Sequence, residues 1–361
     1  MERLGTYIEQ VYRTNADLRY GLDDVRGVSN TKEMMQSRAN LIGRTFEKFS
    51  VISPGDFVFN RRTTRNGEKI GMAFNNTDRD YIFTEDYVAF KVKDECKTVL
   101  LPEYLYLFFR RSEFDRYARY MSTGSATEFF NWEDMCNVPF TPPTMEFQQK
   151  MVRAMATLEQ RIAILQQIND NLEATAQAVL QDKIGANGIE TTVDSIIILF
   201  DSMRRPMSSL ERSEMERIYP YYGAASLMDY VDDYIFDGIY GLLGEDGTVM
   251  DDNGFPTMQY VWGKFWVNNH AHIFQGKNGY STETVYLILK NTVVRNAVTG
   301  AVQLKINQEN LRKLPVVVPC DDDLTELNAL IGRVFATIRT NQTEIEQLAK
   351  LKDILLAKMS D

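Results

Sequence analysis

The chain contains few cysteines, few histidines and no long apolar segment. Its three cysteines, Cys96, Cys136 and Cys320, lie far apart in the 361 residues and form no CxxC pair. We therefore expect neither a disulfide framework nor a cysteine-rich zinc site. Apolar runs such as 196–200 are far shorter than the roughly 18 residues of a membrane span, and the N-terminus lacks the apolar core of a signal peptide. These absences predict a protein of the reducing cytoplasm.

Sequence motifs of several enzyme classes are also missing. No Walker A stretch is present, which excludes a P-loop NTPase. The segment 140–144 (FTPPT) lacks both the acceptor side chain and the aromatic residue of the turn with which a methyltransferase holds a target amine. Asp86, Glu95 and Lys97 are the residue types of a magnesium-dependent nuclease, but so short a pattern is common by chance.

The only histidines, His270 and His272, stand two residues apart. If both lie in one strand, they point to the same face. There they could share a metal ion with acidic residues, contact a polar ligand, or simply pack and hydrogen-bond. Nothing nearby orients either ring for nucleophilic catalysis. We predict no catalytic residue and no metal site, and thus a binding protein.

Apolar residues are plentiful enough for two domain cores. Hydrophobic residues make up 44% of the chain and aromatic residues 11%, and a domain typically needs roughly 100–200 residues. Fifty acidic against forty basic residues give a net charge of −10. Taken alone, this charge argues against a nucleic-acid partner, which usually requires a basic face.

An internal repeat divides the chain. Segment 123–133 recurs in outline as 299–309, an offset of 176, and Val138-Pro139 matches Leu314-Pro315 at the same offset. Each copy ends in an extended, proline-containing segment and is followed by a long helix. The organisation is therefore two α+β globular units, at 1–145 and 187–319, and two long helices, at 146–186 and 320–361. Short strands at 57–59 and 261–267 and a short helix at 101–120 are expected within the units.

Both long helices carry apolar residues at alternating spacings of three and four, a heptad seam. A polar residue, Asn169 or Asn341, interrupts each seam and would fix the register. Matching seams favour helices that pair with each other, although each helix covering its own globular unit is the alternative. The seam positions are Leu158, Ile162, Leu165 and Leu172 in the first helix, and Val334, Ile338, Ile345 and Leu348 in the second.

Basic and polar side chains concentrate in separate segments despite the acidic total. Segment 229–253 holds eight acidic residues and no lysine or arginine, whereas the loops after it are basic and polar. Arginine, asparagine and threonine suit base edges and phosphates. A solvated basic loop and core tyrosines are the alternatives. The predicted DNA-binding residues are Asn60, Arg61, Arg62, Thr63, Arg65 and Lys69 in the first unit, and Tyr222, Asn268, Asn269, His270, Lys277 and Asn278 in the second.

The duplicated arrangement resembles the specificity subunit of a type I restriction–modification system. Segments 221–224 (YYGA), 241–247 (GLLGEDG) and 266–272 (WVNNHAH) resemble a recurrent target-recognition domain of that family, and 53–59 (SPGDFVF) resembles its counterpart in the first unit. The likeness covers nearly the whole chain. It implies a non-catalytic protein with two target-recognition domains, held apart by the two helices packed as an antiparallel coiled coil with pseudo-two-fold symmetry.

The resemblance further implies that each domain reads one half of a bipartite DNA site. A helix of about 38 residues spans about 57 Å, so the helices would set the length of an unread spacer. They would also dock two methyltransferase (M) subunits, and restriction (R) subunits would join. No cofactor is expected in this chain, while S-adenosylmethionine, ATP and magnesium would belong to those partners. The alternative is a protein-interaction scaffold that binds through its heptad helices, with an enzyme in its own right as a third possibility.

Overall fold

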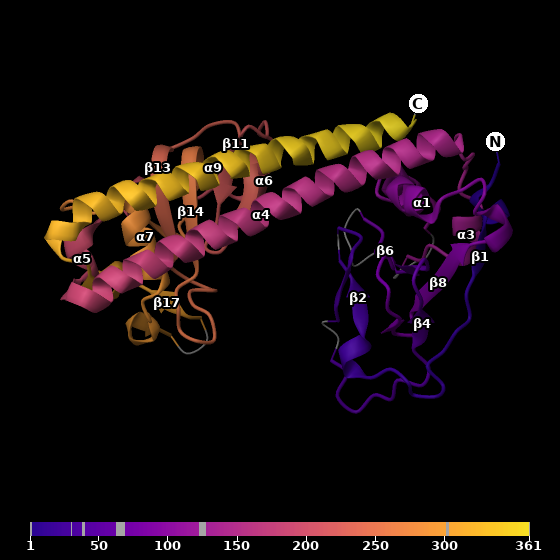
Figure 1. Ribbon diagram of the computed structural model, residues 1–361, viewed down its shortest axis with the longest axis horizontal. Helices are drawn as coiled ribbons and strands as arrows, with labels where there is room; N and C mark the ends of the chain where they lie inside the picture. Colours follow the sequence, from indigo (N-terminus) through magenta and orange to yellow (C-terminus); the bar gives the residue numbers. More distant parts are fainter. Residues whose placement is uncertain are drawn as a thin grey trace. The chain divides into compact units, whose positions relative to one another are not determined.

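The computed structural model describes residues 2–29, 31–37, 40–62, 69–122, 128–300 and 303–360. It divides into two compact units: unit 1 comprises Met1–Ala163 and Glu346–Asp361, and unit 2 comprises Ile164–Ile345. The long helices α4 (Met145–Asn187) and α9 (Asp321–Ala357) each contribute one stretch to each unit (Figure 1). Each unit therefore consists of a globular part packed on two helical segments.

Unit 1 is built around a four-stranded antiparallel sheet in the order β1-β8-β5-β6. Phe57, Val58 and Phe59 of the inner strand β5 are completely buried, and the Phe57 ring stacks on Phe90 at 5.0 Å. Two further antiparallel pairs, β2 with β3 and β4 with β7, complete the strands. The bounds are β1 (Ile8–Gln10), β2 (Arg26–Val28), β3 (Met34–Gln36), β4 (Ser50–Ile52), β5 (Phe57–Asn60), β6 (Met72–Phe74), β7 (Tyr81–Phe83) and β8 (Tyr87–Val92).

The single helix expected at 101–120 is two helices, α1 (Pro102–Phe109) and α2 (Ser112–Met121). Arg111 between them has an extended backbone (φ −74°, ψ 144°). The buried ammonium of Lys32 donates a hydrogen bond to the carbonyl of Phe109, at the end of α1. A tertiary contact thus caps the first helix, which the local sequence does not reveal. The third helix, α3 (Trp132–Cys136), follows, and 3₁₀ turns lie at Leu4–Thr6, Leu22–Asp24 and Asp94–Cys96.

Unit 2 contains a six-stranded sheet in the order β10-β15-β13-β14-β11-β12, in which only β11 and β14 pair in parallel. Helix α7 (Thr282–Lys290) packs on this sheet with its residues from Glu283 to Leu289 all buried. The strands are β9 (Ile189–Thr192), β10 (Ile197–Leu199), β11 (Tyr219–Tyr222), β12 (Leu227–Val231), β13 (Phe236–Gly244), β14 (Met258–Val267), β15 (Ala271–Gly276), β16 (Val298–Thr299), β17 (Lys305–Ile306) and β18 (Pro315–Val318). The remaining helices of unit 2 are α5 (Val193–Ile196), α6 (Ser209–Ser213) and α8 (Gln308–Lys313), with 3₁₀ turns at Asp201–Met203 and Arg295–Ala297. A further 3₁₀ turn, Lys358–Ser360, follows α9 in unit 1.

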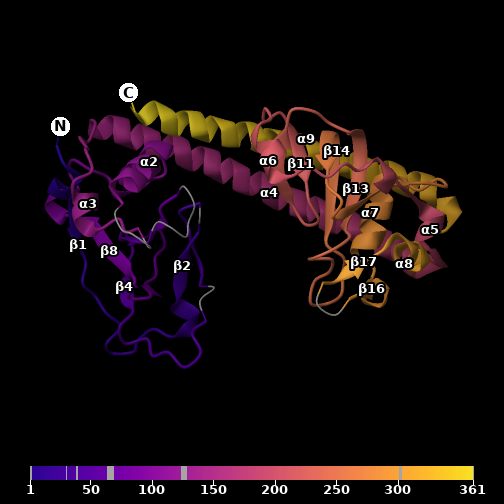
Figure 2. The ribbon, with the colours of Figure 1, turned by 180° about the vertical axis from the view of Figure 1, so that it is seen from behind.

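The two long helices run antiparallel within each unit (Figures 1 and 2). In unit 2, Asn341 Nδ2 donates to Asn169 Oδ1 at 2.8 Å and Lys183 pairs with Asp323 at 2.8 Å. Residue numbers therefore increase along α4 in the direction in which they decrease along α9. In unit 1, Lys352 pairs with Glu159 at 2.9 Å. The two asparagines that interrupt the seams therefore meet each other.

The eight seam residues are all buried or half-buried. Some of them also face the globular parts, since Val334 and Ile338 pack on the main core of unit 2. Likewise Met151 and Met155, at the start of the first seam, belong to the core of unit 1. The helices thus pair with each other and cover their globular units at the same time.

Candidate nucleic-acid interface

In unit 1 the basic segment begins where β5 ends. Asn60, the last residue of β5, accepts a hydrogen bond from the backbone N–H of Arg62 at 3.0 Å. The backbone carbonyl of Arg61 accepts a hydrogen bond from the Phe130 N–H, and Arg61 itself is exposed. Arg62 is half-buried and lies 3.6 Å from Asp86. Lys69 is exposed where the described chain resumes, and Thr63 and Arg65 lie outside the described residues.

In unit 2 the predicted residues fall into two groups at opposite ends of β15. Asn268, Asn269 and His270 precede this strand, and Lys277 and Asn278 follow it. Six residues at about 3.3 Å each separate the groups by roughly 20 Å. The structure therefore does not bring these five residues into one site.

The group before β15 includes Tyr222. The backbone N–H of Asn268 donates to the carbonyl of Tyr222 at 3.0 Å, and the Tyr222 ring meets Phe265 edge-on at 5.9 Å. Asn268 is only 4% exposed, and its Oδ1 accepts from the backbone N–H of His270. Asn268 thus shapes the loop, whereas the exposed Asn269 and His270 present polar groups to solvent.

The group after β15 lies at the junction with α9. Asn278 has a left-handed backbone (φ 53°), and its amide donates to the carbonyl of Ser195 at 2.8 Å. Asn328 of α9 donates to the carbonyl of the neighbouring Gly279 at 2.7 Å. These bonds anchor the turn to the helix, a structural role that the sequence pattern did not distinguish from DNA contact.

The two histidines do not share a site. His270 lies in the turn before β15 with its side chain 47% exposed, and its Nδ1 is 2.5 Å from Asp246. His272 lies inside the strand, completely buried, with Nδ1 2.5 Å from Asp201 and Nε2 2.8 Å from the carbonyl of Ile306. The same-face expectation fails because only His272 belongs to the strand.

His272, Asp201 and Glu245 converge closely enough to resemble a metal site, a cluster that the sequence analysis missed. The guanidinium of Arg204 lies among them, 2.5 Å from Glu245 and 3.5 Å from Asp201. Gln308 donates to Asp201 at 2.7 Å, and Lys305 pairs with Glu245 at 3.1 Å. Because a fixed cation and these donors already occupy the carboxylate oxygens, the cluster is a buried ion-pair network.

This network connects residues from several strands next to the loop of Asn269 and His270. Burial alone would raise the pKa of Asp201, but hydrogen bonds from His272 and Ile273 and the charge of Arg204 together lower it. Burial by itself would also raise the pKa of Glu245, but Arg204, His272 and Lys305 outweigh this effect and lower the pKa of that carboxyl. Arg204 additionally donates to the carbonyls of Asn269 and Ala271, which holds the loop in place.

These features define a class of protein. It is a duplicated α+β chain with a shared antiparallel helix pair and with exposed basic or polar loops in each unit. Residues 30–174 and 198–355 match the family described as type I restriction modification DNA specificity domain, so both halves are matched separately. The chain belongs to this family. The family and the α+β fold class predicted from the sequence are both confirmed.

The relatives are specificity subunits by name. A putative type I restriction enzyme specificity subunit from Haemophilus influenzae is 29% identical over 144 residues, which are 40% of this chain and 36% of that protein. The HindI type I restriction enzyme specificity subunit, from the same organism, is 25% identical over 132 residues, 36% of this chain and 28% of that protein. The alignments thus span about a third of these relatives.

A solved structure shares the fold over nearly the whole length. The type I restriction–modification S subunit from M. genitalium superposes with a TM-score of 0.54 at 12% identity and covers 98% of this chain and 94% of that one. Within the described part of the chain, no helix has the length and apolar character needed to cross a bilayer.

Proposed function

We propose that this chain is the DNA-sequence specificity subunit of a type I restriction–modification assembly. Its two units each read one half of a bipartite DNA site, and α4 and α9 set the unread spacer between the halves. The observation that carries the proposal is the duplication itself: each half matches the specificity domain separately, and each unit is attached to the same antiparallel helix pair.

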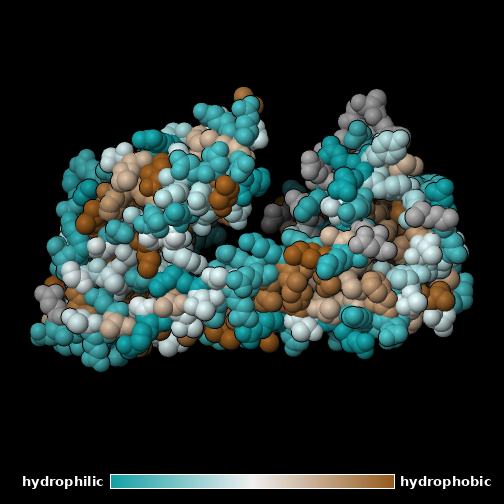
Figure 3. Space-filling model, turned by 90° about the horizontal axis from the view of Figure 1, so that it is seen from above, coloured by the Kyte–Doolittle hydropathy of each residue, from teal (hydrophilic) through white to brown (hydrophobic). Residues whose placement is uncertain are grey.

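The helices are also the proposed docking surface for two methyltransferase (M) subunits, which restriction (R) subunits join. Four large apolar side chains on these helices are exposed to between 39% and 52%: Ile164, Ile168, Leu351 and Ile354. Hydrophobic areas interrupt the hydrophilic surface in Figure 3. Exposed apolar side chains on a helix support a protein contact there. S-adenosylmethionine, ATP and magnesium belong to the partner subunits in this proposal.

Binding of the full-length chain to duplex DNA tests the proposal against a protein-interaction scaffold. Affinity for DNA falls steeply with salt because the protein displaces counterions from phosphates. We expect a labelled 30-base-pair duplex to bind with a steep negative slope of log affinity against log salt concentration. Salt-independent binding, or none, would favour the scaffold.

Arg61 provides the residue-level arm of this test because its side chain is exposed. Arg61→Ala should weaken duplex binding several-fold and reduce the salt slope by about one phosphate contact. The exposed Arg153 of α4 offers a charge-matched control variant, Arg153→Ala, which should bind as the wild type does. Equal affinities for Arg61→Ala and the wild type would remove Arg61 from the interface.

A further inference from the structure

The sheets of the two units share a set of four strands. In unit 1 these strands lie in the order β1-β8-β5-β6, and in unit 2 the matching strands lie in the order β10-β15-β13-β14. Each set also follows the same order along the chain, and every neighbouring pair is antiparallel. Strand β5 of unit 1 therefore corresponds to β13 of unit 2, and β8 corresponds to β15.

The register of these strand pairs matches as well. Asn60, the last residue of β5, pairs with Tyr87, the first residue of β8. In unit 2, Gly244 ends β13 and pairs with Ala271, which begins β15. Because both pairs close their ladders at the same end of the sheet, the residues just beyond them can be compared one by one.

Hydrogen bonds beyond the strands support this correspondence. The carbonyl of Arg61 accepts a hydrogen bond from the N–H of Phe130 at 2.9 Å. In unit 2 the carbonyl of Glu245 accepts one from the N–H of Ile306, also at 2.9 Å. Phe130 and Ile306 are separated by 176 residues, which is the offset of the internal repeat. Arg61 therefore corresponds to Glu245, and the residues that follow them correspond to each other.

These following residues belong to pairs of different chemistry in the two units. In unit 1, Arg62 lies 3.6 Å from Asp86, the residue that precedes β8. In unit 2, Asp246 takes the place of Arg62, and its Oδ1 lies 2.5 Å from Nδ1 of His270, the residue that precedes β15. A cation beside the end of the inner strand is thus replaced by a carboxylate in the other repeat.

DNA-binding residues that the sequence predicts in both units lie at this position. In unit 1 they are Arg61 and Arg62, which follow the inner strand β5, and in unit 2 they are Asn269 and His270, which precede the neighbouring strand β15. The two groups come from different places in the repeat, yet the structure puts both at the same end of the shared sheet. The side chains of Arg62 and His270 are 41% and 47% exposed, so both reach solvent.

The two pairs present different hydrogen-bonding groups. Arginine side chains carry donors only. In unit 2, the carboxylate of Asp246 accepts the hydrogen of His270 Nδ1, and Nε2 of this ring has no partner among the described residues. In the neutral ring, Nε2 is then an acceptor. Unit 2 therefore offers acceptors at the position where Arg61 and Arg62 of unit 1 offer donors.

We propose that this position reads a base pair in both units and that the exchanged pair makes the two half-sites differ there, an inference that rests on the proposed function. Arginine donors fit the O6 and N7 acceptors of guanine, whereas the acceptors of Asp246 and His270 fit the exocyclic amino group of adenine or cytosine. Lys305 lies opposite Asp246 in a bridge, and its 47% exposed side chain supplies positive charge there.

Exchanging the pairs between the units tests the proposal. The variant Asp246→Arg, His270→Asp gives unit 2 the pair of unit 1, and Arg62→Asp, Asp86→His is the reciprocal variant. The full-length chain is produced with its methyltransferase subunits, and the methylated sites are mapped. The first variant should change one base pair of one half-site, from adenine or cytosine to guanine on the contacted strand. The reciprocal variant should make the opposite change in the other half-site.

Binding to a labelled 30-base-pair duplex measures the size of the effect. The first variant should bind the wild-type site about tenfold more weakly, as expected for one lost base contact. Replacing the single base pair in the duplex should restore the affinity. The variant adds one positive charge to the chain, so weaker general attraction to DNA does not explain the loss.

The matched control exchanges a charged pair elsewhere in the same strands. Asp237 and Lys264 are exposed and pair across β13 and β14, at the opposite end of β13 from Gly244. Asp237→Lys, Lys264→Asp should leave the methylated site and the duplex affinity unchanged. Thermal midpoints of all variants show whether each unit is folded, and an exchanged variant that unfolds leaves the reciprocal one as the test.

An unchanged methylated site in the folded exchange variants overturns this inference and leaves the proposed function standing. Equal weakening on every duplex, without a change in the preferred base pair, would assign the position to the DNA backbone and also overturn it. If the wild type with its methyltransferase subunits methylates no bipartite site, the proposed function itself fails.

Discussion

His272 and Asp201 meet in the interior of unit 2, and their hydrogen bonds explain how a short loop is held in one conformation. Both ring nitrogens of His272 face oxygen acceptors, the carboxylate of Asp201 and the carbonyl of Ile306. The carboxylates of Asp201 and Glu245 also lie beside the guanidinium of Arg204. The network fixes the backbone from which Asn269 and His270 project.

Asp201→Asn should destabilise unit 2 by about 2–4 kcal/mol at pH 7, because it removes a buried counter-charge of Arg204. The lowered pKa of Asp201 means that its contribution is present above its ordinary value of 3.8 and is lost as the pH falls through its lower folded value. Unfolding by urea between pH 7 and pH 3 should show the free energies of the wild type and the variant converging at the acid end. Asp237→Asn, at an exposed position of β13, is the control. A constant difference across this range would contradict the assignment.

At the scale of elements, the helix pair depends on apolar seams with one polar contact. Leu165 and Ile345 are buried, and Asn169 and Asn341 hydrogen-bond in the same stretch of the helices. A polar pair in an apolar seam stabilises less than leucines would, but it favours the one register in which the two amides meet. The asparagines therefore fix which residues of α4 and α9 face each other.

A double-mutant cycle tests this role. Asn341→Leu alone should cost about 1–2 kcal/mol because it leaves the amide of Asn169 unpaired, and the double change to leucine should cost less than the sum of the single changes. Urea unfolding of the four proteins measures the coupling. Asn171→Leu, at an exposed position of α4, is the matched control. Strictly additive effects would show that the pair does not specify register.

At the scale of the whole molecule, the proposed function links the length of α4 and α9 to the number of unread base pairs between the two half-sites. Removing one heptad from both α4 and α9 shortens each helix by about 10.5 Å, which equals about three base pairs of DNA. Under the proposed function, the spacer of the methylated site should shorten by a similar number while both half-sites stay the same. Methylation mapping in cells that carry the altered chain and its methyltransferase subunits measures both. An unchanged spacer would contradict the role of the helices in setting it.

The charge of the whole chain also has a different meaning once its distribution is known. The net charge of −10 argues against DNA binding. Several acidic side chains, however, form ion pairs within the chain. Asp229 lies near Arg212 and Arg217, and Glu245 lies within the buried network. The exposed Arg61 of unit 1, in contrast, places a positive charge at the surface. Local charge decides where an anion binds, since salt screens distant charges.

The sequence by itself determined the duplication, the long helices and their seams, because heptad spacing and repeated proline-containing segments are local signals that read directly along the chain. It also indicated that Asn169 and Asn341 were the exceptional seam positions. The family followed from the same duplicated pattern.

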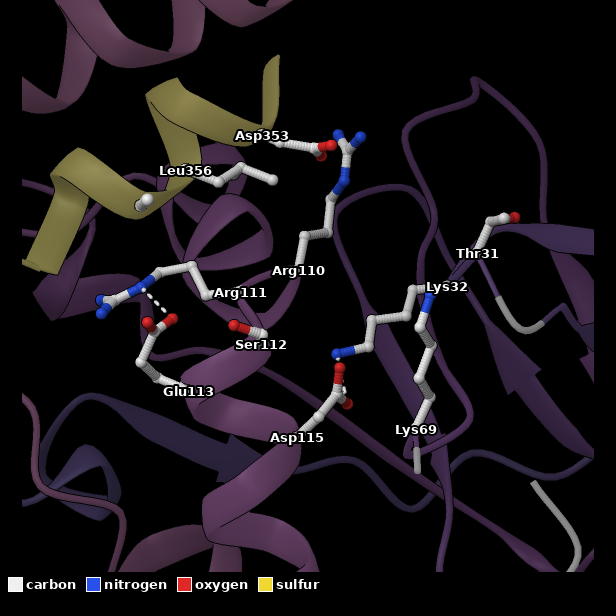
Figure 4. A pocket seen from close by; sticks show the side chains of 11 residues that line it. Thr31, Lys32, Lys69, Arg110, Arg111, Ser112, Glu113, Asp115, Asp353 and Leu356 are labelled. Atoms are coloured by element: carbon white, nitrogen blue, oxygen red, sulfur yellow. Dashed lines mark ion pairs between the residues drawn. The ribbon is translucent and has the colours of Figure 1, made fainter. Parts of the chain in front are cut away.

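Only the tertiary structure decided which polar residues share a site. Residues 268–270 and 277–278 are close in sequence but stand at opposite ends of β15, while Asp201, Glu245 and His272 are distant in sequence and meet. A cavity of unit 1 likewise combines residues from 31 to 357 (Figure 4). Strand pairing and helix packing bring such groups together, and no local spacing records those contacts, so the network and the cavity became visible only in the folded chain.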